Sequence, residues 1–535
     1  MSLLGQSFPR FAILAYFCSA SLGYAHEHGD PLPLTVRLGQ VSFANSCKPQ
    51  VKTDFNRAVA FLHSFWLDEA ERRFARISSV DPNCAMALWG IAMADFNQIN
   101  GGPTPDGAAR AAEALARADA ASERTPRESA YIRALHAFFD GYSETDFDAH
   151  AKRYTEAMQR VAAAYPTDTE AQVFYALALI NSQADEDLDR TNNRKAVAIL
   201  EPLFKTHPNH PGIAHYIIHA TDSPAMATQG LEAARRYAAI APAAPHALHM
   251  PSHIFARLGL WEDDIQSNLA SKAAAEDPGL HAGAENRLHA MEFLEYAYLQ
   301  IGRDDDALAI VSEGASVKKS DVDARYPTYY ADVEARLPAL YAIETGDWTM
   351  AGGLLPNAQG DWTAQGRTLL ANAIAAGHLR DAKAGKAVAE RIESLTKDIA
   401  YLRTGSPKAT LPDEIRAWAR FAQGATDGAL DLLNVVADRQ EQVGKGEVEL
   451  PAREMLATML SLEGRHAEAL TAYQRSLVSD PNRFNALLGA ATAAEELHYE
   501  GTASRYYRAL LANCRAPNGR ARQKLEHAKA YLVNQ

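Results

Sequence analysis

The sequence lacks the patterns of several large protein classes. After residue 25 no stretch reaches eighteen apolar residues, so we expect no membrane span. Basic residues are fewer than acidic ones, 53 against 66, and the net charge of −13 argues against nucleic acid and against an anionic membrane surface as main partners. Strand-like alternation of apolar and polar residues is nearly absent, which favours an all-α protein.

Several catalytic signatures are also missing. The helical sequence contains no His-Glu-x-x-His zinc-protease motif, no Gly-x-Ser-x-Gly elbow, no P-loop and no Rossmann fingerprint. Catalysis is therefore the less favoured hypothesis, and no catalytic residue is assigned from the sequence.

Cysteine is scarce, with four residues in the chain. Cys18 lies in an apolar N-terminal stretch that resembles a signal peptide. Of the remaining three, Cys47 and Cys84 are candidates for a disulfide in an oxidising compartment, while Cys514 is expected to be a small buried apolar residue.

The first 25 residues predict a cleaved signal peptide. Arg10 precedes an apolar core at 11–22, which is too short to span a bilayer, and Gly23-Tyr24-Ala25 places small residues where signal peptidase reads them. We therefore expect a soluble protein that is periplasmic or secreted. Residues 26–50 contain Pro31 and Pro33 and predict an extended lead-in.

From residue 51 onward the sequence is helical and repetitive. Small, aromatic and proline residues recur at nearly the same offsets in two distant places: Ala58, Phe61, Ala70, Phe74, Ile77 and Pro82; Ala457, Leu460, Ala469, Tyr473 and Pro481. This resembles the tetratricopeptide repeat, in which small residues lie where helices cross and an aromatic side chain fills the gap to the next unit.

Glycines mark further helix ends in the repeats. We expect left-handed residues at Gly259, Gly302, Gly346, Gly377, Gly424 and Gly464. The predicted fold is a right-handed α-solenoid of TPR-like helix–turn–helix repeats, with one array at 51–400 and a second at 413–535. A loop at 401–412 divides them.

Histidines gather in one part of the first array, in register with the repeat. Seven of the eighteen histidines lie between residues 207 and 253. Pro211 and Pro245 are 34 residues apart, as are His215 and His249, and His219 and His253. Each copy of the helix therefore carries a histidine pair at i, i+4, which faces one side of a helix.

A third copy extends this pattern and predicts a strip across three adjacent helices, a His-rich groove at 207–292. Pro251 falls within the middle helix and is expected to kink it or delay its start. The predicted strip contains His215, His219, Asp222, His246, His249, His253, Arg257, Glu285, His289 and Glu292.

Three interpretations of this strip remain open. Imidazoles with carboxylates suit Zn²⁺, Cu²⁺, Ni²⁺ or Fe²⁺, with His215, His219, His249, His253 and His289 as candidate ligands and Asp222, Glu285 or Glu292 as candidate bases. Alternatively, histidines and Arg257 grip a polar or anionic ligand without metal. In the third interpretation, the histidines only bridge helices.

The segment His-Pro-Gly-x-Ala-His-Tyr-x-Ile-His, followed by His-Ala-x-His-Met-Pro-Ser-His-Ile-Phe, resembles a group of exported bacterial tetratricopeptide-repeat proteins of unassigned activity. The resemblance implies a fold and an envelope location. We therefore predict a binding or scaffold protein whose groove takes a protein, a peptide or a small polar ligand. The alternative is a metal-binding protein or metal-dependent enzyme centred on the same strip.

Overall fold

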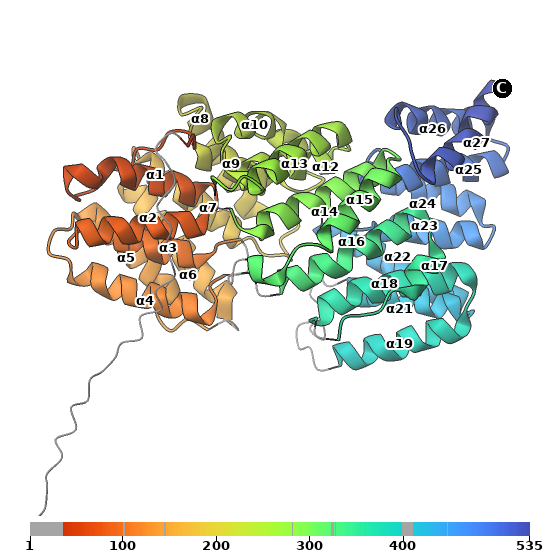
Figure 1. The fold of residues 1–535 in the computed structure, drawn as a ribbon, viewed down its shortest axis with the longest axis horizontal. Helices are drawn as coiled ribbons and strands as arrows, with labels where there is room; N and C mark the ends of the chain where they lie inside the picture. The colour runs from red at the N-terminus through yellow and green to blue at the C-terminus, as the bar shows by residue number, and fades with distance from the viewer. Residues whose placement is uncertain are drawn as a thin grey trace, which may run out of the picture. The chain divides into compact units, whose positions relative to one another are not determined.

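The computed structural model describes residues 36–99, 102–143, 146–280, 282–322, 326, 328–358, 360–397, 410–446 and 448–534. Within these ranges it contains no β-strand, only an isolated bridge between Arg303 and Asn518, so the predicted all-α fold is confirmed (Figure 1). The predicted signal peptide and the start of the lead-in lie outside the described residues. From 36 to 48 the lead-in has no helix, and a 3-10 turn, η1 (Pro49–Val51), follows.

Helices follow one another through the first part of the array. They are α1 (Lys52–His63), α2 (Leu67–Val80), α3 (Ala85–Phe96), α4 (Pro105–Ala120), α5 (Pro126–Phe139), α6 (Phe147–Ala164), α7 (Thr169–Asn181), α8 (Thr191–Thr206), α9 (Pro211–Thr221), α10 (Ala227–Ile240), α11 (Pro245–His249), α12 (Pro251–Arg257), α13 (Trp261–Ala275), α14 (Ala284–Gln300) and α15 (Asp304–Gly314).

The remaining elements continue in the same manner. They are η3 (Lys319–Asp321), α16 (Tyr329–Thr345), α17 (Trp348–Gly353), α18 (Trp362–Leu379), α19 (Ala382–Thr396), α21 (Leu411–Ala422), α22 (Thr426–Val443), α23 (Ala452–Leu462), α24 (His466–Ser479), α25 (Phe484–Glu496), α26 (Glu500–Asn513) and α27 (Ala521–Val533).

The repeat pattern has a direct packing cause. The Phe74 ring of α2 lies where a side chain on Gly90 of α3 would begin, and the Tyr473 ring of α24 lies in the same way against Gly489 of α25. Because only glycine leaves this space, the second helix of one unit packs closely on the first helix of the next. The chain is thus a TPR-like array of helix–turn–helix units.

Five of the six predicted helix-ending glycines have the expected left-handed backbone: Gly259, Gly302, Gly346, Gly424 and Gly464. The prediction for Gly377 is wrong, because this residue lies inside α18 and the left-handed residue that ends the helix is Arg380, at φ 53°. Gly377 instead lies against the Trp418 ring of α21, where a larger residue would clash.

The core continues through the array. One cluster of buried apolar side chains runs from residue 38 to 255, and another runs from 339 to 528, on both sides of the loop predicted at 401–412. A smaller cluster that includes Met291, Phe293 and Leu294 lies in α14. The histidine-bearing helices α9, α11, α12 and α14 belong to the first and third clusters. In the described part of the chain, no helix is long and apolar enough to cross a membrane.

Cys47 and Cys84 form a disulfide, with their Cα atoms 4.7 Å apart. It ties the lead-in to the start of α3, and the backbone N–H of Lys48 donates to the buried Asp81 carboxylate beside it. Cys514 is free and buried, and burial raises the pKa of its thiol to about 12, so this side chain is an unreactive part of the core.

Candidate metal centre

The helix break that Pro251 predicts is present and does not separate the histidines. The chain forms α11 up to His249 and α12 from Pro251 onward, with Met250 between them at φ −51° and ψ −33°. These angles are helical, so the side chains continue around the same axis. The rings of His246 and His249 remain 6.2 Å apart, and those of His249 and His253 remain 5.0 Å apart.

Three histidines from α9 and α11 converge in a first triad: His215, His219 and His246. The Nε2 atom of His215 lies 3.0 Å from Nε2 of His219 and 3.1 Å from Nε2 of His246. One nitrogen from each residue lies within 4.8 Å of the others, a separation that suits ligands of one metal ion.

A second triad comes from α11, α12 and α14: His249, His253 and His289. The Nε2 atoms of His249 and His253 are 3.0 Å apart, and the ring centroids of His249 and His289 are 4.1 Å apart. Their ligand atoms also lie within 4.8 Å of one another. The triads are neighbours, because the rings of His219 and His253 approach to 6.4 Å.

The other ring nitrogen is held by an acceptor in two buried histidines. Nδ1 of His215 lies 2.6 Å from the backbone carbonyl of His63, and Nδ1 of His249 lies 2.6 Å from Oδ1 of Asn268. The amide group of Asn268 donates to Asp264, which fixes its oxygen toward His249. Since both partners only accept, the proton of each neutral ring is on Nδ1, and Nε2 carries the lone pair.

Carboxylates hold the Nδ1 atoms of two further histidines. His253 contacts Asp222 at 3.0 Å, and Arg257 also donates to Asp222 at 3.0 Å and to the Lys445 carbonyl at 2.8 Å. Arg257 is therefore committed to supporting a carboxylate. In a metal site, such partners orient the ligating histidine and raise its basicity.

The second carboxylate is Glu292 of α14, whose Oε2 lies 3.2 Å from Nδ1 of His289. Tyr329 donates to the same oxygen at 2.5 Å, and Arg336 lies 3.2 Å from the other oxygen. Burial alone would raise the pKa of Glu292, but Arg336 and these hydrogen bonds hold its pKa below the usual value. Glu292 is thus an ionised acceptor for His289.

Three histidines of the triads are uncharged at neutral pH. Burial, followed by repulsion from neighbouring histidines, places the pKa values of His215, His246 and His249 well below 6.5. The lone pair on Nε2 of His249 therefore faces Nε2 of His253, whose own Nδ1 proton points to Asp222. Two acceptor nitrogens at 3.0 Å repel each other unless a proton or metal ion lies between them.

In a nearby histidine cluster, by contrast, every ring nitrogen has a hydrogen-bond partner of the opposite kind. His63 and His210 each contact the buried Glu170 through Nε2, at 2.9 and 3.0 Å. The Nδ1 atoms accept from the Tyr216 hydroxyl and from a backbone N–H of α9, respectively. Every donor here meets an acceptor, so this cluster is complete as a hydrogen-bond network and positions the carbonyl that holds His215.

A cavity of about 270 Å³ lies beside both triads. His246 of the first triad and His289 of the second line it, together with Glu285 and the aromatic residues Phe65 and Tyr329. Of the three predicted carboxylates, Glu285 is the one in this lining. The other two, as described above, hold histidines of the second triad.

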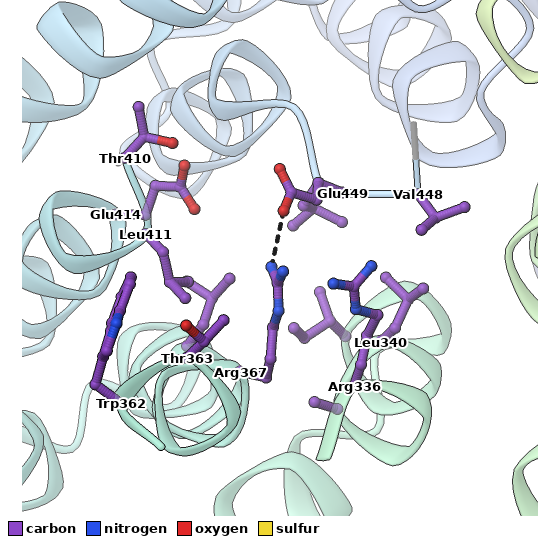
Figure 2. Close-up of a pocket in the computed structure, with 14 residues that line it drawn as sticks. Arg336, Leu340, Trp362, Thr363, Arg367, Thr410, Leu411, Glu414, Val448 and Glu449 are labelled. Atoms are coloured by element: carbon purple, nitrogen blue, oxygen red, sulfur yellow. Dashed lines mark hydrogen bonds and ion pairs between the residues drawn. The ribbon is translucent and has the colours of Figure 1, made fainter. Parts of the chain in front are cut away.

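A separate pocket of about 290 Å³ lies between α16, α18 and α21 (Figure 2). Arg367 extends to Glu449 at 3.0 Å, Arg336 lies parallel to it, and the Glu414 carboxyl faces them across the pocket (Figure 2). Burial, followed by repulsion from Glu449, raises the pKa of Glu414 to about 8. Through Arg336 this pocket is connected to the support of His289.

The structure brings the predicted histidine-bearing helices together and adds residues that the sequence pattern did not include. His246 was predicted to line the groove, yet it was not among the candidate metal ligands, and it completes the first triad. Phe65, Asn268 and Arg336 were not predicted at all. Phe65 lies in the turn between α1 and α2, Asn268 in α13 and Arg336 in α16, and no spacing rule relates them to the triads.

Comparisons with known proteins add little to this geometry. No protein-family model matches the chain, and no curated protein matches it. Among solved structures, human IFIT1 in a dimer with m7Gppp-AAAA is similar, with 11% identity, a TM-score of 0.38 and coverage of 84% of this chain and 89% of that one. The TPR domain of P58(IPK) has 13% identity and a TM-score of 0.20, over 91% of this chain and 99% of that one. Both TM-scores lie below 0.5, so the fold and the site stand on the chain's own helices and side chains.

Proposed function

We propose that the protein is a metalloprotein that binds two neighbouring transition-metal ions, one in each histidine triad. The observation that carries this proposal is the arrangement of the ring nitrogens. In each triad one nitrogen from every histidine lies within 4.8 Å of the others, while Nδ1 of His215, His249, His253 and His289 is held by an acceptor behind the ring. This is the arrangement of ligating histidines and their supporting partners in metalloproteins.

The donors favour particular metals. Neutral imidazole nitrogens suit Cu and Zn, whereas Mg²⁺, Ca²⁺ and Mn²⁺ prefer oxygen ligands. Three protein ligands for each ion leave a coordination position for a further ligand, as in catalytic rather than structural zinc sites. The cavity beside His246 and His289 gives a small molecule access to that position.

This arrangement supports a metal-dependent enzyme that acts on a small substrate. When bound, the ions would act as Lewis acids toward a water or substrate molecule. Of the three candidate bases predicted from the sequence, Glu285 is the one that lines the cavity, where it accepts a hydrogen bond from Asn286, whereas Asp222 and Glu292 support histidines.

Variants of single ligands test the proposal. Untagged protein is loaded with Zn²⁺ or Cu²⁺, dialysed, and analysed for metal by mass spectrometry. We expect about two ions per chain in the wild type, with one lost in His246→Ala and one lost in His289→Ala. His498→Ala, an exposed histidine outside the cluster, is the control and should keep both. Absence of bound metal, or equal metal content in all variants, would overturn the proposal.

Export of the protein is also proposed. The disulfide between Cys47 and Cys84 supports an oxidising compartment, in agreement with the signal peptide predicted at 1–25. Sequencing the N-terminus of the mature bacterial protein from the periplasmic fraction should give His26 as the first residue. A cytoplasmic protein that retains the first 25 residues would contradict export.

A TPR-like array is also a common scaffold for binding proteins and ligands, because stacked helix pairs form extended surfaces. A protein or peptide partner in the groove therefore remains compatible with the fold. The metal proposal concerns the histidine triads only, so a partner elsewhere on the array is independent of it.

A further inference from the structure

From the cavity beside the triads we infer the class of substrate: a single-ring phenol, with its ring against Phe65 and its oxygen toward the two metal ions. This inference rests on the proposed function, because the ions supply the partner for the oxygen. The phenol oxygen is the group that would enter the open coordination positions of the ions.

The first support is the aromatic wall. Phe65, Trp66 and Tyr329 all line the cavity of about 270 Å³, which is at the small end of ligand sites. Aromatic rings favour a planar aromatic guest over an aliphatic one of equal size, by offset or edge contacts. The volume is ample for one aromatic ring.

The second support is the conformation of Phe65. Its φ is 52°, in the left-handed region that a bulky residue rarely adopts, and this places the ring over the first triad. The ring is nearly parallel to that of His246, with centroids 5.6 Å apart, and meets His215 edge-on at 4.5 Å. Strain of this kind is found at ligand and active sites, where the surrounding structure enforces it.

The third support is the charge of the lining. None of the described lining residues is a lysine or arginine, whereas Asp68 and Glu285 are both present. The lining therefore offers a phosphate or carboxylate group no side-chain cation, and its two carboxylates offset part of the positive charge of the bound ions. A phenol is neutral in solution and brings only one oxygen to the metal ions, so it fits both features.

The cavity also reaches both metal sites at once. His246 belongs to the first triad and His289 to the second, and each contributes to the lining. A ligand oxygen between these two side chains would meet a ligating residue of each proposed ion, with the ring on the side of Phe65. An aliphatic alcohol would present the same oxygen without the ring contacts.

The test uses Zn²⁺-loaded full-length protein whose metal content has been measured in the same sample. Binding of 4-nitrophenol, cyclohexanol and benzoate is measured by equilibrium dialysis at a pH below the pKa of 4-nitrophenol, so that this probe is mostly neutral while benzoate is an anion. We expect 4-nitrophenol to bind at least tenfold more tightly than the other two. Binding of cyclohexanol or benzoate as tight as that of 4-nitrophenol would overturn the inference.

Two variants locate the ring. Phe65→Leu keeps an apolar side chain but removes the aromatic face, and should weaken 4-nitrophenol binding about two- to tenfold without loss of metal. Trp362→Leu, in the separate pocket of Figure 2, is the matched control and should bind normally. Unchanged binding in Phe65→Leu would overturn the inference.

Metal content distinguishes the two possible failures. If two ions are bound per chain and no phenol binds, the substrate class is wrong and the metal centre stands. If no metal is bound, both the proposed function and the phenol inference are overturned.

Discussion

Replacing Glu414 by glutamine should make the protein more stable, and the gain should grow with pH. Glu414 is buried in α21, where Oε1 accepts a hydrogen bond from the Gln440 amide at 2.7 Å. Burial, followed by repulsion from Glu449, raises its pKa from 4.5 to about 8. The folded protein therefore keeps this proton at neutral pH, while the unfolded chain releases it.

The sign and magnitude of this change in unfolding free energy follow from proton linkage. Between pH 4.5 and 8 the unfolded state binds fewer protons than the folded state, so the free energy of unfolding falls as pH rises. A shift of this size corresponds to a loss of about 5 kcal/mol once the pH is above 8. Glutamine has the same shape, keeps an acceptor for Gln440 and carries no charge at any of these pH values.

The assay is urea unfolding followed by far-ultraviolet circular dichroism at pH 5.0 and 8.5. The difference in unfolding free energy between Glu414→Gln and wild type should rise by several kcal/mol from the lower to the higher pH. Glu390→Gln, at an exposed glutamate of α19, is the control and should show no such rise. A difference that stays the same at the two pH values would refute a raised pKa at Glu414.

Three further changes test other parts of the structure. Replacing Cys47 and Cys84 by alanine should lower the free energy of unfolding by about 4 kcal/mol, because the disulfide closes a loop between residues 37 positions apart in the sequence. An unchanged urea midpoint would contradict this. Asn268→Ala should weaken metal binding about 10- to 100-fold in a chelator competition, because a ligating histidine loses its support; unchanged affinity would contradict that role. In thermal unfolding, Gly90→Ala should destabilise the fold by about 1–3 kcal/mol, because the new methyl group overlaps the Phe74 ring. Gly428→Ala has open space around it and should stabilise the fold by up to about 1 kcal/mol; equal effects of the two variants would contradict this packing.

The fold could be predicted from the sequence because the repeat leaves local marks. Proline at the end of some units and glycine at helix ends act within a few residues of where they lie, and the aromatic residue of the second helix packs on the next unit along the chain. Gly377 shows the limit of this reasoning. A glycine that ends a helix and one that admits a neighbouring ring look the same in the sequence, and only the Trp418 contact distinguishes them.

Part of the candidate site was also accessible to sequence reasoning. The i, i+4 spacing and the repeat length placed His215 with His219 and His249 with His253, and carrying the register forward found His289. Joining His246 to the first triad requires knowing how α11 docks against α9. No periodicity contains that information, so the place of His246 in the first triad appears only in three dimensions.

The supporting partners are still further from any sequence pattern. The carbonyl that holds His215 belongs to His63, 152 residues away, and its acceptor role does not depend on the side chain. Arg336 acts on His289 only through Glu292, and it does so from a helix without histidines. These contacts arise from tertiary packing, which is why the strip was predicted and its electrostatic support was not.

The central claim is most directly tested by X-ray absorption spectroscopy at the metal edge of untagged protein as purified. A centre of two three-histidine sites predicts a first shell dominated by nitrogen at about 2.0–2.1 Å, with the outer-shell scattering of imidazole rings from about three histidines per ion. No metal edge above background, or a first shell of sulfur or of oxygen without imidazole scattering, would contradict it.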